Sequence, residues 1–547
     1  MAAEKGLIVA CALGDCVHVA GVMNFLHLAE QQGWETAFLG PATSVAELVG
    51  AIQEAEPELV AVSYRLSPEA ARRLFDQLAA AVQQAGAGER RFILGGTPPV
   101  CAVGEETGFF ERSFSSHSTE AEIIAFLRGE EIGPGASDYP QDLVTRIRSQ
   151  APYPVLRHHF GLPDLLKTIA GISRLAMAQV LDVISLGPDQ NAQAHFFHPE
   201  RMDPAQDGAG GVPIRTEADL ATLYQASRCG NYPLMRCYSG TADVIRFAEL
   251  LLRTINNAWC AVPLCWYNVL DGRGTRPVRV SIAQAQELMA WHAERAVPVE
   301  VNEAHHWSLR AAPDTVAVAA AYLAAYNARA AGVKNYVAQY MFNTPPGTSG
   351  VMDLAKMLAK AELIESLHNK EFTSWRQVRT GLASLAADLN VAKGELAAST
   401  YLQMALRPHI IHVVSFSEAD HAATAEDVIE ACQITRGVIG HCLSGMPNMA
   451  EDVRVQERKE ELLAEVNLTL AAIRNVAPAA VKDPFTDGET LARAIETGVL
   501  DAPHLAGNEA GFGRSMTKVV DGACRAVDSA GRVLSEAERL AALAALD

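Results

Sequence analysis

The sequence lacks any run of about eighteen or more apolar residues, so it predicts no helix that spans a membrane. Its opening residues form a short apolar stretch that leads into Gly14-Asp15, without the features of a signal peptide. Basic residues are outnumbered: 45 Lys and Arg face 64 Asp and Glu, and the formal net charge is -19. This balance does not suit a long nucleic-acid footprint. We therefore expect a cytoplasmic protein that binds neither nucleic acid nor a membrane.

Cysteine pairs with metal-binding spacing are also absent. The ten cysteines stand alone or in loose pairs, and no Cys-x-x-Cys occurs. Zinc ribbons, thioredoxin-like redox sites and radical iron–sulfur sites depend on closely spaced cysteines, so all three are excluded. No lysine can be recognised as the Schiff-base residue of a pyridoxal phosphate site, so an aminomutase is not indicated.

The composition itself is that of a globular protein: 547 residues, 49% hydrophobic, are enough for two or three packed domains. In the first part of the chain, β-rich apolar runs alternate with helical patterns. Strands are expected at Leu7–Ala12, Thr36–Leu39, Leu59–Ser63 and Phe92–Leu94, and helices at Val19–Gln32, Val45–Ala55, Pro68–Ala85 and Glu120–Leu127. This alternation predicts an α/β domain with a parallel sheet, in which ligands bind beyond the carboxyl ends of the strands.

A stretch rich in Gly, Pro, Ser and Asp, Gly129–Asp142, indicates a linker. Beyond it, strand-like runs separated by Ala- and Leu-rich helical segments favour a (β/α)8 TIM barrel. These runs are Val180–Leu186, Leu234–Tyr238, Trp259–Leu264, Val297–Val301, Asn335–Tyr340 and Ile410–Val414. The predicted domains are 1–128, a linker 129–153, the barrel 154–448, and a C-terminal helical extension 449–547 packing on the barrel.

The loop after the first expected strand reads Gly14-Asp15-Cys16-Val17-His18-Val19-Ala20-Gly21. The cobalt of a corrinoid needs an imidazole ligand, a group that holds the other ring nitrogen, and a glycine where the macrocycle approaches; His18, Asp15 and Gly21 are suitable. Alone, the loop also fits a helix-capping Asp15 and a hydrogen-bonded His18. Small residues end two further strands, Ser63 and Gly95-Gly96, and the three loops together favour cobalamin, with His18 as the cobalt ligand.

These residues resemble the cobalamin-binding domain of the B12-dependent mutases, most closely the small subunit of glutamate mutase. The family pattern is Asp-x-His-x-x-Gly, then Ser-x-Leu, then Gly-Gly. In this chain Asp15 stands one residue too early, Cys16 occupies the carboxylate position, and Leu66 comes one residue late. Ser116–Glu120 resembles the family's closing loop near the nucleotide tail. The resemblance implies a Rossmann-like domain with cofactor-binding residues Asp15, Cys16, His18, Gly21, Ser63, Leu66, Gly95, Gly96 and Ser116.

The barrel segment resembles the large subunit of glutamate mutase, with short matching strings in the right order. They are Pro233-Leu234 with Gly240-Thr241, Trp259 with Tyr267-Asn268-Val269, Gly332–Asn335, Glu418-Ala419, and Glu496–Pro503. Both subunits of such a mutase then stand fused in one chain. The resemblance implies an adenosylcobalamin-dependent radical isomerase, a carbon-skeleton mutase for a small-molecule substrate, and a possible homodimer.

The substrate is expected to differ from glutamate. Glutamate mutases clamp two carboxylates with three arginines, and most of that clamp is missing at the matching places. Arg236 sits one or two residues off and can be a relic, a substrate ligand or an outer-face residue. A family lysine that contacts the adenosyl group is replaced by Val414 or Ser415, although Glu418 remains and is assigned to the cofactor.

Replacement groups gather at Glu300–Trp307, at the end of an expected barrel strand, where carboxylates, histidines and Trp307 suit a cationic or hydroxylated substrate. The predicted catalytic residues are Glu303, His305, Arg236 and Tyr340. The His305-His306 pair is a weaker candidate for a metal, because neighbours on a strand end point apart. Asp420-His421 can act as acid and base, but helix capping explains these residues more simply.

Two other functions remain open. A corrinoid methyltransferase would use methylcobalamin, and the missing lysine favours it. A cobalamin-binding sensor is less well supported, because it has no need of a complete barrel.

Overall fold

The computed structural model describes residues 6–115, 118, 120–129, 139–238, 240 and 242–545. The chain divides into two compact units, Met1–Pro134 and Gly135–Asp547, and each is described by itself. Ser116 and Thr241, both named from the sequence, lie outside the described residues. Within the described part of the chain, no helix combines the length and the apolar character needed to cross a membrane.

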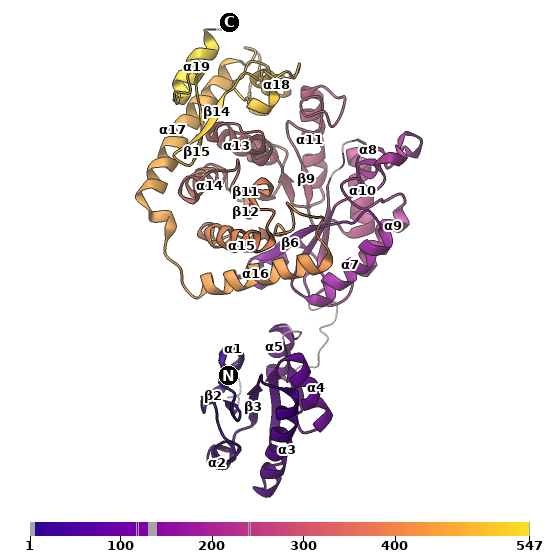
Figure 1. Ribbon diagram of the computed structural model, residues 1–547. Helices are drawn as coiled ribbons and strands as arrows, with labels where there is room; N and C mark the ends of the chain where they lie inside the picture. The colour runs from indigo at the N-terminus through magenta and orange to yellow at the C-terminus, as the bar shows by residue number, and fades with distance from the viewer. Residues whose placement is uncertain are drawn as a thin grey trace. The chain divides into compact units, whose positions relative to one another are not determined.

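The first unit contains a five-stranded parallel sheet in the order β2-β1-β3-β4-β5 (Figure 1). Its strands are β1 Leu7–Ala12, β2 Glu35–Phe38, β3 Leu59–Tyr64, β4 Arg91–Gly96 and β5 Arg112–Phe114. Its helices are α1 Ala20–Gln31, α2 Val45–Ala55, α3 Pro68–Gln84, α4 Pro98–Thr107 and α5 Glu120–Arg128. All four predicted strands and all four predicted helices are present, whereas α4 and β5 were not predicted.

Both faces of this sheet are covered by helices, which explains why its central strands are almost continuously apolar. On one face, Phe25 of α1 and Leu127 of α5 pack with Ile8 of β1. On the other, Leu48 of α2 and Phe75 of α3 pack with residues of β1, β3 and β4. The carboxyl ends of the parallel strands consequently lie together along one edge of the sheet.

The second unit is built around eight parallel strands in the order β8-β7-β6-β13-β12-β11-β10-β9. They are β6 Val155–Phe160, β7 Val183–Leu186, β8 Leu234–Cys237, β9 Cys260–Val262, β10 Val299–Val301, β11 Asn335–Phe342, β12 Thr373–Thr380 and β13 Ile410–His412. The sheet almost closes on itself: beside β9, Ala258 donates a backbone hydrogen bond to Met235 of β8 at 2.9 Å. The structure thus confirms an α/β protein with an eight-stranded, barrel-like parallel sheet.

Helices surround these strands (Figure 1). They are α7 Leu165–Ala178, α9 Glu217–Ala226, α10 Val244–Ile255, α11 Val278–Ala293, α13 Asp314–Ala330, α14 Gly350–Glu365, α15 Leu389–Gln403 and α16 Ala425–Leu443, with short α8 Gln190–His195 and α12 Ala304–Leu309 in the loops. One more helix, α6 Leu143–Gln150, falls inside the predicted linker. Its Leu143 and Ile147 pack with Val155, Val337 and other residues near the amino ends of the strands, so this unit begins before the predicted boundary.

The C-terminal extension packs on the outer helices α13 and α14. It consists of α17 Val453–Asn475, α18 Gly488–Glu496, β14 Thr517–Val520, β15 Ala523–Ala526 and α19 Glu536–Ala544. The antiparallel pair β14 and β15 departs from the prediction of a purely helical extension. A buried charge anchors it, since the Asp314 carboxylate accepts the backbone N–H of Cys524 at 3.1 Å and pairs with Arg458 at 3.5 Å.

Candidate functional site

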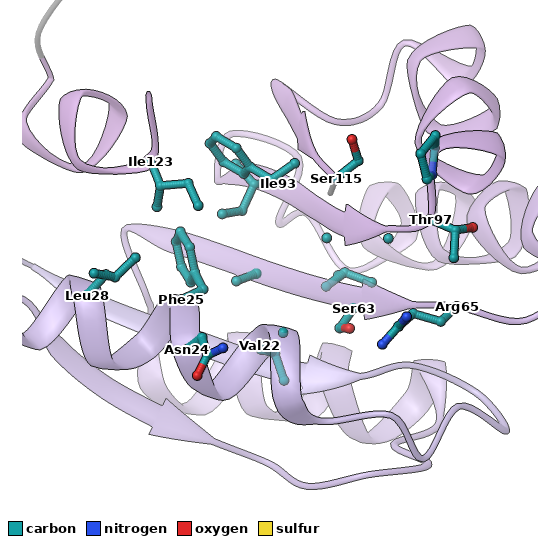
Figure 2. Close-up of a pocket in the computed structure, with 17 residues that line it drawn as sticks. Val22, Asn24, Phe25, Leu28, Ser63, Arg65, Ile93, Thr97, Ser115 and Ile123 are labelled. Carbon is teal, nitrogen blue, oxygen red and sulfur yellow. The ribbon is translucent and has the colours of Figure 1, made fainter. Parts of the chain in front are cut away.

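A cavity of about 380 Å³ opens in the first unit between helix α1 and the carboxyl ends of β3 and β4 (Figure 2). Val22, Phe25 and Leu28 of α1 form one apolar wall, and Ile123 of α5 faces the cavity from another side. Polar groups enter at the strand ends: Ser63, Arg65, Thr97 and Ser115. The cavity is therefore mostly apolar, with a few polar groups at one end, as is usual for small-molecule sites.

The predicted cobalt ligand, His18, lies exposed on the loop between β1 and α1. The neighbouring Cys16 is fully buried, and its Sγ lies 3.8 Å from Nδ1 of His18. Asp15, by contrast, is exposed. The thiol of Cys16 therefore stands next to the ring nitrogen that a carboxylate would hold in the family pattern.

Of the three predicted glycines, two leave open space where a side chain would project into the cavity. A Cβ on Gly21, which lines the cavity three residues after His18, would meet no atom within 4 Å. A Cβ on Gly95 would meet only the backbone oxygen of Val62, at 3.9 Å. Gly96 is different, since a Cβ there would lie 2.8 Å from the backbone oxygen of Tyr64. Gly21 and Gly95 thus keep the cavity open, and Gly96 permits close packing of β4 on β3.

The cavity adds residues that the sequence did not single out, and four predicted cofactor-binding residues of this unit do not line it: Asp15, Cys16, His18 and Leu66. Leu66 is 39% exposed and does not line the cavity, whereas Arg65 does. Side chains alternate along an extended chain, so Ser63 and Arg65 share one side and Leu66 faces another. This alternation was a usable sequence signal for Arg65. Thr97, also in the lining, belongs to the strand-end loop Gly95–Thr97 that the sequence marks for ligand binding, whereas Asn24 carried no such signal.

In the second unit, alternation along the strands sends one set of side chains into the barrel. Nearest the amino ends this set is apolar, with Val155, Leu234, Val337, Trp375 and Ile410 in one cluster. The next inward positions, two residues further along, are polar. They are Arg157 on β6, Ser185 on β7, Arg236 on β8, Glu300 on β10, Gln339 on β11, Gln377 on β12 and His412 on β13.

Glu300 is the centre of this polar layer. Its Oε2 accepts hydrogen bonds from Nη1 of Arg157 and Nη2 of Arg236, both at 3.2 Å, and from Nε1 of Trp259 at 2.7 Å. Burial alone would raise the pKa of Glu300, but Arg236, Arg157 and Trp259 together hold it below its ordinary value. Burial, and then repulsion from Arg236, lower the pKa of Arg157 to about 9, so it remains charged at neutral pH. The result is a buried, ionised triad.

A neutral histidine lies above the triad. His159 Nε2 accepts from Nη2 of Arg157 and from the hydroxyl of Tyr238, both at 2.9 Å, because a guanidinium can only donate. Its proton therefore belongs on Nδ1. Burial, with the neighbouring arginines, keeps the pKa of both His159 and His412 well below the ordinary value.

Arg379, on β12, is the third guanidinium inside the barrel. It is 8% exposed, and its one hydrogen bond in the described part of the chain runs from Nε to the backbone oxygen of Thr380 at 3.4 Å. No carboxylate of the described residues lies within ion-pairing distance. Burial lowers its pKa, while Tyr238 and then Glu300 and Glu418 favour the charged form.

Of the predicted catalytic residues, Arg236 is the one that the structure places in this layer. It is fully buried, and its Nε and Nη1 have no hydrogen-bond partner among the described residues. Tyr340 lies on the opposite side of β11 from Gln339, packed between the strands and the outer helices. The structure therefore does not bring Tyr340 together with Arg236.

Glu303 and His305 lie at the start of α12, after β10. The Glu303 carboxylate accepts the backbone N–H groups of Leu264 and Cys265 at 2.9 and 3.0 Å, and Nε1 of Trp307 at 2.8 Å. Burial nevertheless raises its pKa. His305 is buried with Nδ1 unpartnered in the described part of the chain, so it keeps a free polar atom. No group of three or more His, Cys, Asp or Glu among the described residues is placed to hold a metal ion, and the His305-His306 pair thus has no third ligand there.

Glu418 and the neighbouring Asp420-His421 follow β13. Glu418 lies at the surface with its side chain partly exposed, but the protein packed around the carboxyl group raises its pKa against the opposing effect of Arg379. His421 bridges Asp420 and Asp427 at 2.6 and 3.1 Å, at the N-terminus of α16. The N-cap of α16 is Thr424, in a capping box with Asp427, so Asp420 and His421 do not cap this helix themselves; His421 contacts the Asp427 carboxylate of the capping box.

The buried layer contains functional candidates that sequence reasoning missed, above all Arg157, His159 and Arg379. They lie on β6 and β12, the two barrel strands that were not predicted, because charged residues interrupt their apolar pattern. Spacing by two residues, as in Arg157 with His159 and Gln377 with Arg379, was the available signal. The arginines expected from the family are thus absent from the matching positions, yet three arginines enter the barrel from β6, β8 and β12.

Comparison with known proteins establishes neither the family nor the fold of this chain. No family model and no curated protein matches the chain. Among solved structures, a cobalamin-binding protein from Desulfitobacterium hafniense DCB-2 is 24% identical over 23% of this chain, with a TM-score of 0.20. The match spans 59% of that protein. The cobalamin-dependent S-adenosylmethionine radical enzyme OxsB, in its apo form, is 8% identical over 92% of this chain and 74% of its own, with a TM-score of 0.19. Scores this low establish no common fold.

Proposed function

We propose that this protein is an adenosylcobalamin-dependent radical isomerase, a carbon-skeleton mutase acting on a small substrate other than glutamate. The observation that carries the proposal is the exposed imidazole of His18, three residues before Gly21, which lines a mostly apolar cavity together with Ser63 and Gly95. A cobalamin needs both features: a free nitrogen ligand for cobalt, and a slot for the nucleotide tail that this ligand displaces.

The residues of the first unit fit the group. His18 would supply the axial nitrogen, and Cys16 would orient its ring through Nδ1. Gly21 and Gly95 would admit the tail, because no side chain fills the cavity at these positions. Ser63, Thr97 and Ser115 would offer hydrogen bonds to its polar groups. When bound, adenosylcobalamin supplies hydrogen-atom abstraction by an organic radical, chemistry that no amino acid side chain provides.

The barrel would bind and shield the substrate. Its inward layer offers buried donors on Arg236 and Gln377 that have no hydrogen-bond partner among the described residues, together with neutral histidines. Radical rearrangement needs positioning and exclusion of water more than acid–base catalysis. A preformed, buried polar layer of this kind can hold a small molecule in one orientation. A homodimer through the barrel, implied by the resemblance, remains part of the proposal.

A corrinoid methyltransferase is the second candidate, and one contact favours it. At the place where the family has a lysine that contacts the adenosyl group, the hydroxyls of Ser415 and Ser417 are buried and bind one another at 2.9 Å. This arrangement offers the adenosyl group no cation. Methylcobalamin would not need one.

The test is to incubate the purified full-length protein anaerobically with adenosyl-, methyl- and hydroxocobalamin, and to record the affinity and visible spectrum for each. Preference for adenosylcobalamin, followed by radical signals on addition of a substrate, is the expected result. Preference for methylcobalamin would favour the methyltransferase. Absence of binding to all three would refute a cobalamin protein.

A further inference from the structure

The interior of the barrel carries more positive than negative charge. Three guanidiniums, those of Arg157, Arg236 and Arg379, point inward, whereas Glu300 is the one carboxylate on the eight described strands. The two interior histidines are neutral at pH 7, as shown above. On the strands themselves, the three inward guanidiniums face one carboxylate, an excess of two positive charges.

Glu300 already serves as the anion for two of these groups. Its Oε2 lies 3.2 Å from both Arg157 and Arg236, so this carboxylate occupies the position between them. A ligand carboxylate aimed at the same position would meet a like charge in a low-dielectric interior, which is strongly unfavourable. The arginine pair is thus closed to a second anion.

Arg379 has no such partner. Its contact with the backbone oxygen of Thr380, at 3.4 Å, leaves the two terminal nitrogens without a hydrogen bond among the described residues. Arg236 likewise keeps Nε and Nη1 unsatisfied. Arg379 is 8% exposed, so a small anion that enters the barrel can reach its terminal nitrogens and pair with them in a largely desolvated setting. A bidentate guanidinium–carboxylate pair is the strongest contact of this type.

We propose that Arg379 binds one carboxylate of the substrate and that Glu300, by filling the position between Arg157 and Arg236, makes the barrel selective for monocarboxylates over dicarboxylates. The inference rests on the proposed function in taking the barrel as the substrate site. It names the substrate class as a small carboxylic acid with one acidic group.

The first experiment measures ligand binding by calorimetry on the full-length protein without cobalamin, with butyrate and glutarate as probes. The wild type should bind one butyrate, and glutarate at least tenfold more weakly. Arg379→Met should weaken butyrate binding at least tenfold, because it removes the guanidinium that would pair with the carboxylate. Equal binding of the two acids, or a variant that still binds butyrate, would overturn the proposal.

The second experiment tests Glu300. Glu300→Ala frees two buried guanidiniums, so its melting temperature should fall and should be recovered by added glutarate, which can now reach both anion positions. Glu303→Gln is the matched control: it neutralises another buried carboxylate in the same unit, but one held by backbone N–H groups and Trp307 rather than by arginines. Glutarate should not stabilise it. If Glu300→Ala does not fold, the butyrate and glutarate measurements on the wild type and on Arg379→Met decide whether the barrel has a monocarboxylate site.

Cobalamin binding and monocarboxylate binding can be tested independently of one another. Cobalamin binding is read from visible spectra and depends on the first unit, whereas butyrate binding is measured without cobalamin. Normal cobalamin binding with no binding of butyrate would refute the monocarboxylate site alone. Butyrate binding with no binding of cobalamin would refute the proposed function and leave the anion site standing.

Discussion

The thiol of the buried Cys16 lies 3.8 Å from Nδ1 of the exposed His18. In the family pattern a carboxylate holds this ring nitrogen. A thiol is a weaker hydrogen-bond acceptor than a carboxylate and carries no charge when protonated. His18 should therefore be a weaker cobalt ligand here than a carboxylate-supported histidine would be.

Cys16→Ala should weaken cobalamin binding about tenfold, the lower end of what the loss of an orienting group usually costs. Cys16→Asp should restore or exceed the wild-type affinity, because it supplies the stronger acceptor. Cys101→Ala is the control, since this thiol of the same unit donates to the backbone oxygen of Phe114 and does not contact His18. Titrations followed by visible absorption measure all three. Equal affinity of Cys16→Ala and wild type would remove Cys16 from the site.

His18→Ala should weaken cobalamin binding more strongly than Cys16→Ala and change the visible spectrum of the bound cofactor, because the axial nitrogen is lost. His27 offers a control: it is exposed on α1 and hydrogen-bonds Gln31 at 2.9 Å, so His27→Ala should leave the spectrum unchanged. A spectrum unaltered by His18→Ala would contradict its role as ligand.

Gly95→Leu should abolish cobalamin binding with little change in melting temperature, since the new side chain has room within the cavity itself. Gly96→Ala is expected to behave in the opposite way. Its Cβ would lie 2.8 Å from the backbone oxygen of Tyr64, so it should lower stability before it affects the cavity. Thermal unfolding and cobalamin titration of both variants distinguish the two effects. Unimpaired binding by a folded Gly95→Leu variant would show that the cavity is not the tail site.

Glu303→Gln and His305→Gln should both lower activity but differ in stability. The Glu303 carboxylate accepts three buried hydrogen bonds, so replacing one oxygen by an NH₂ group should cost about 1–3 kcal/mol. His305→Gln should be nearly neutral, because Nδ1 makes no hydrogen bond among the described residues. Urea unfolding, with turnover once a substrate is found, measures both. Full function in both variants would instead favour the sensor.

The barrel unit should lose stability in mild acid. Burial lowers the pKa of His158 to about 4 from an ordinary value of 6.5, so the unfolded chain takes up the proton first as the pH falls. The contribution of neutral His158 to the free energy of unfolding is on the order of 3 kcal/mol. It is complete above about pH 6.5 and is lost by about pH 4. Urea unfolding at about pH 7 and about pH 5 measures the slope. His158→Gln should make the slope smaller, although other buried histidines such as His159 and His412 also contribute to it, and an unchanged slope would contradict this account.

In the first unit, local patterns predicted every strand except β5 and every helix except α4. The strand Leu7–Ala12 and the helix Val45–Ala55 have the predicted bounds, because uninterrupted apolar runs and a Ser44 cap define them within a few residues. In the barrel, the same patterns failed at β6 and β12. Arg157 and Arg379 face a polar barrel interior, so the sequences of these two strands lack the apolar pattern of a buried strand.

By itself, the sequence determined the alternation of strands and helices, the loop that carries His18, and the small residues at the ends of β3 and β4, since each depends on neighbours a few residues apart. Only the tertiary structure decided which charges meet. Arg157, Arg236 and Glu300 are separated by up to 143 residues, yet they share one oxygen atom. Such contacts follow from the closing of eight strands around a common axis, which brings distant residues together in a way that no local pattern records.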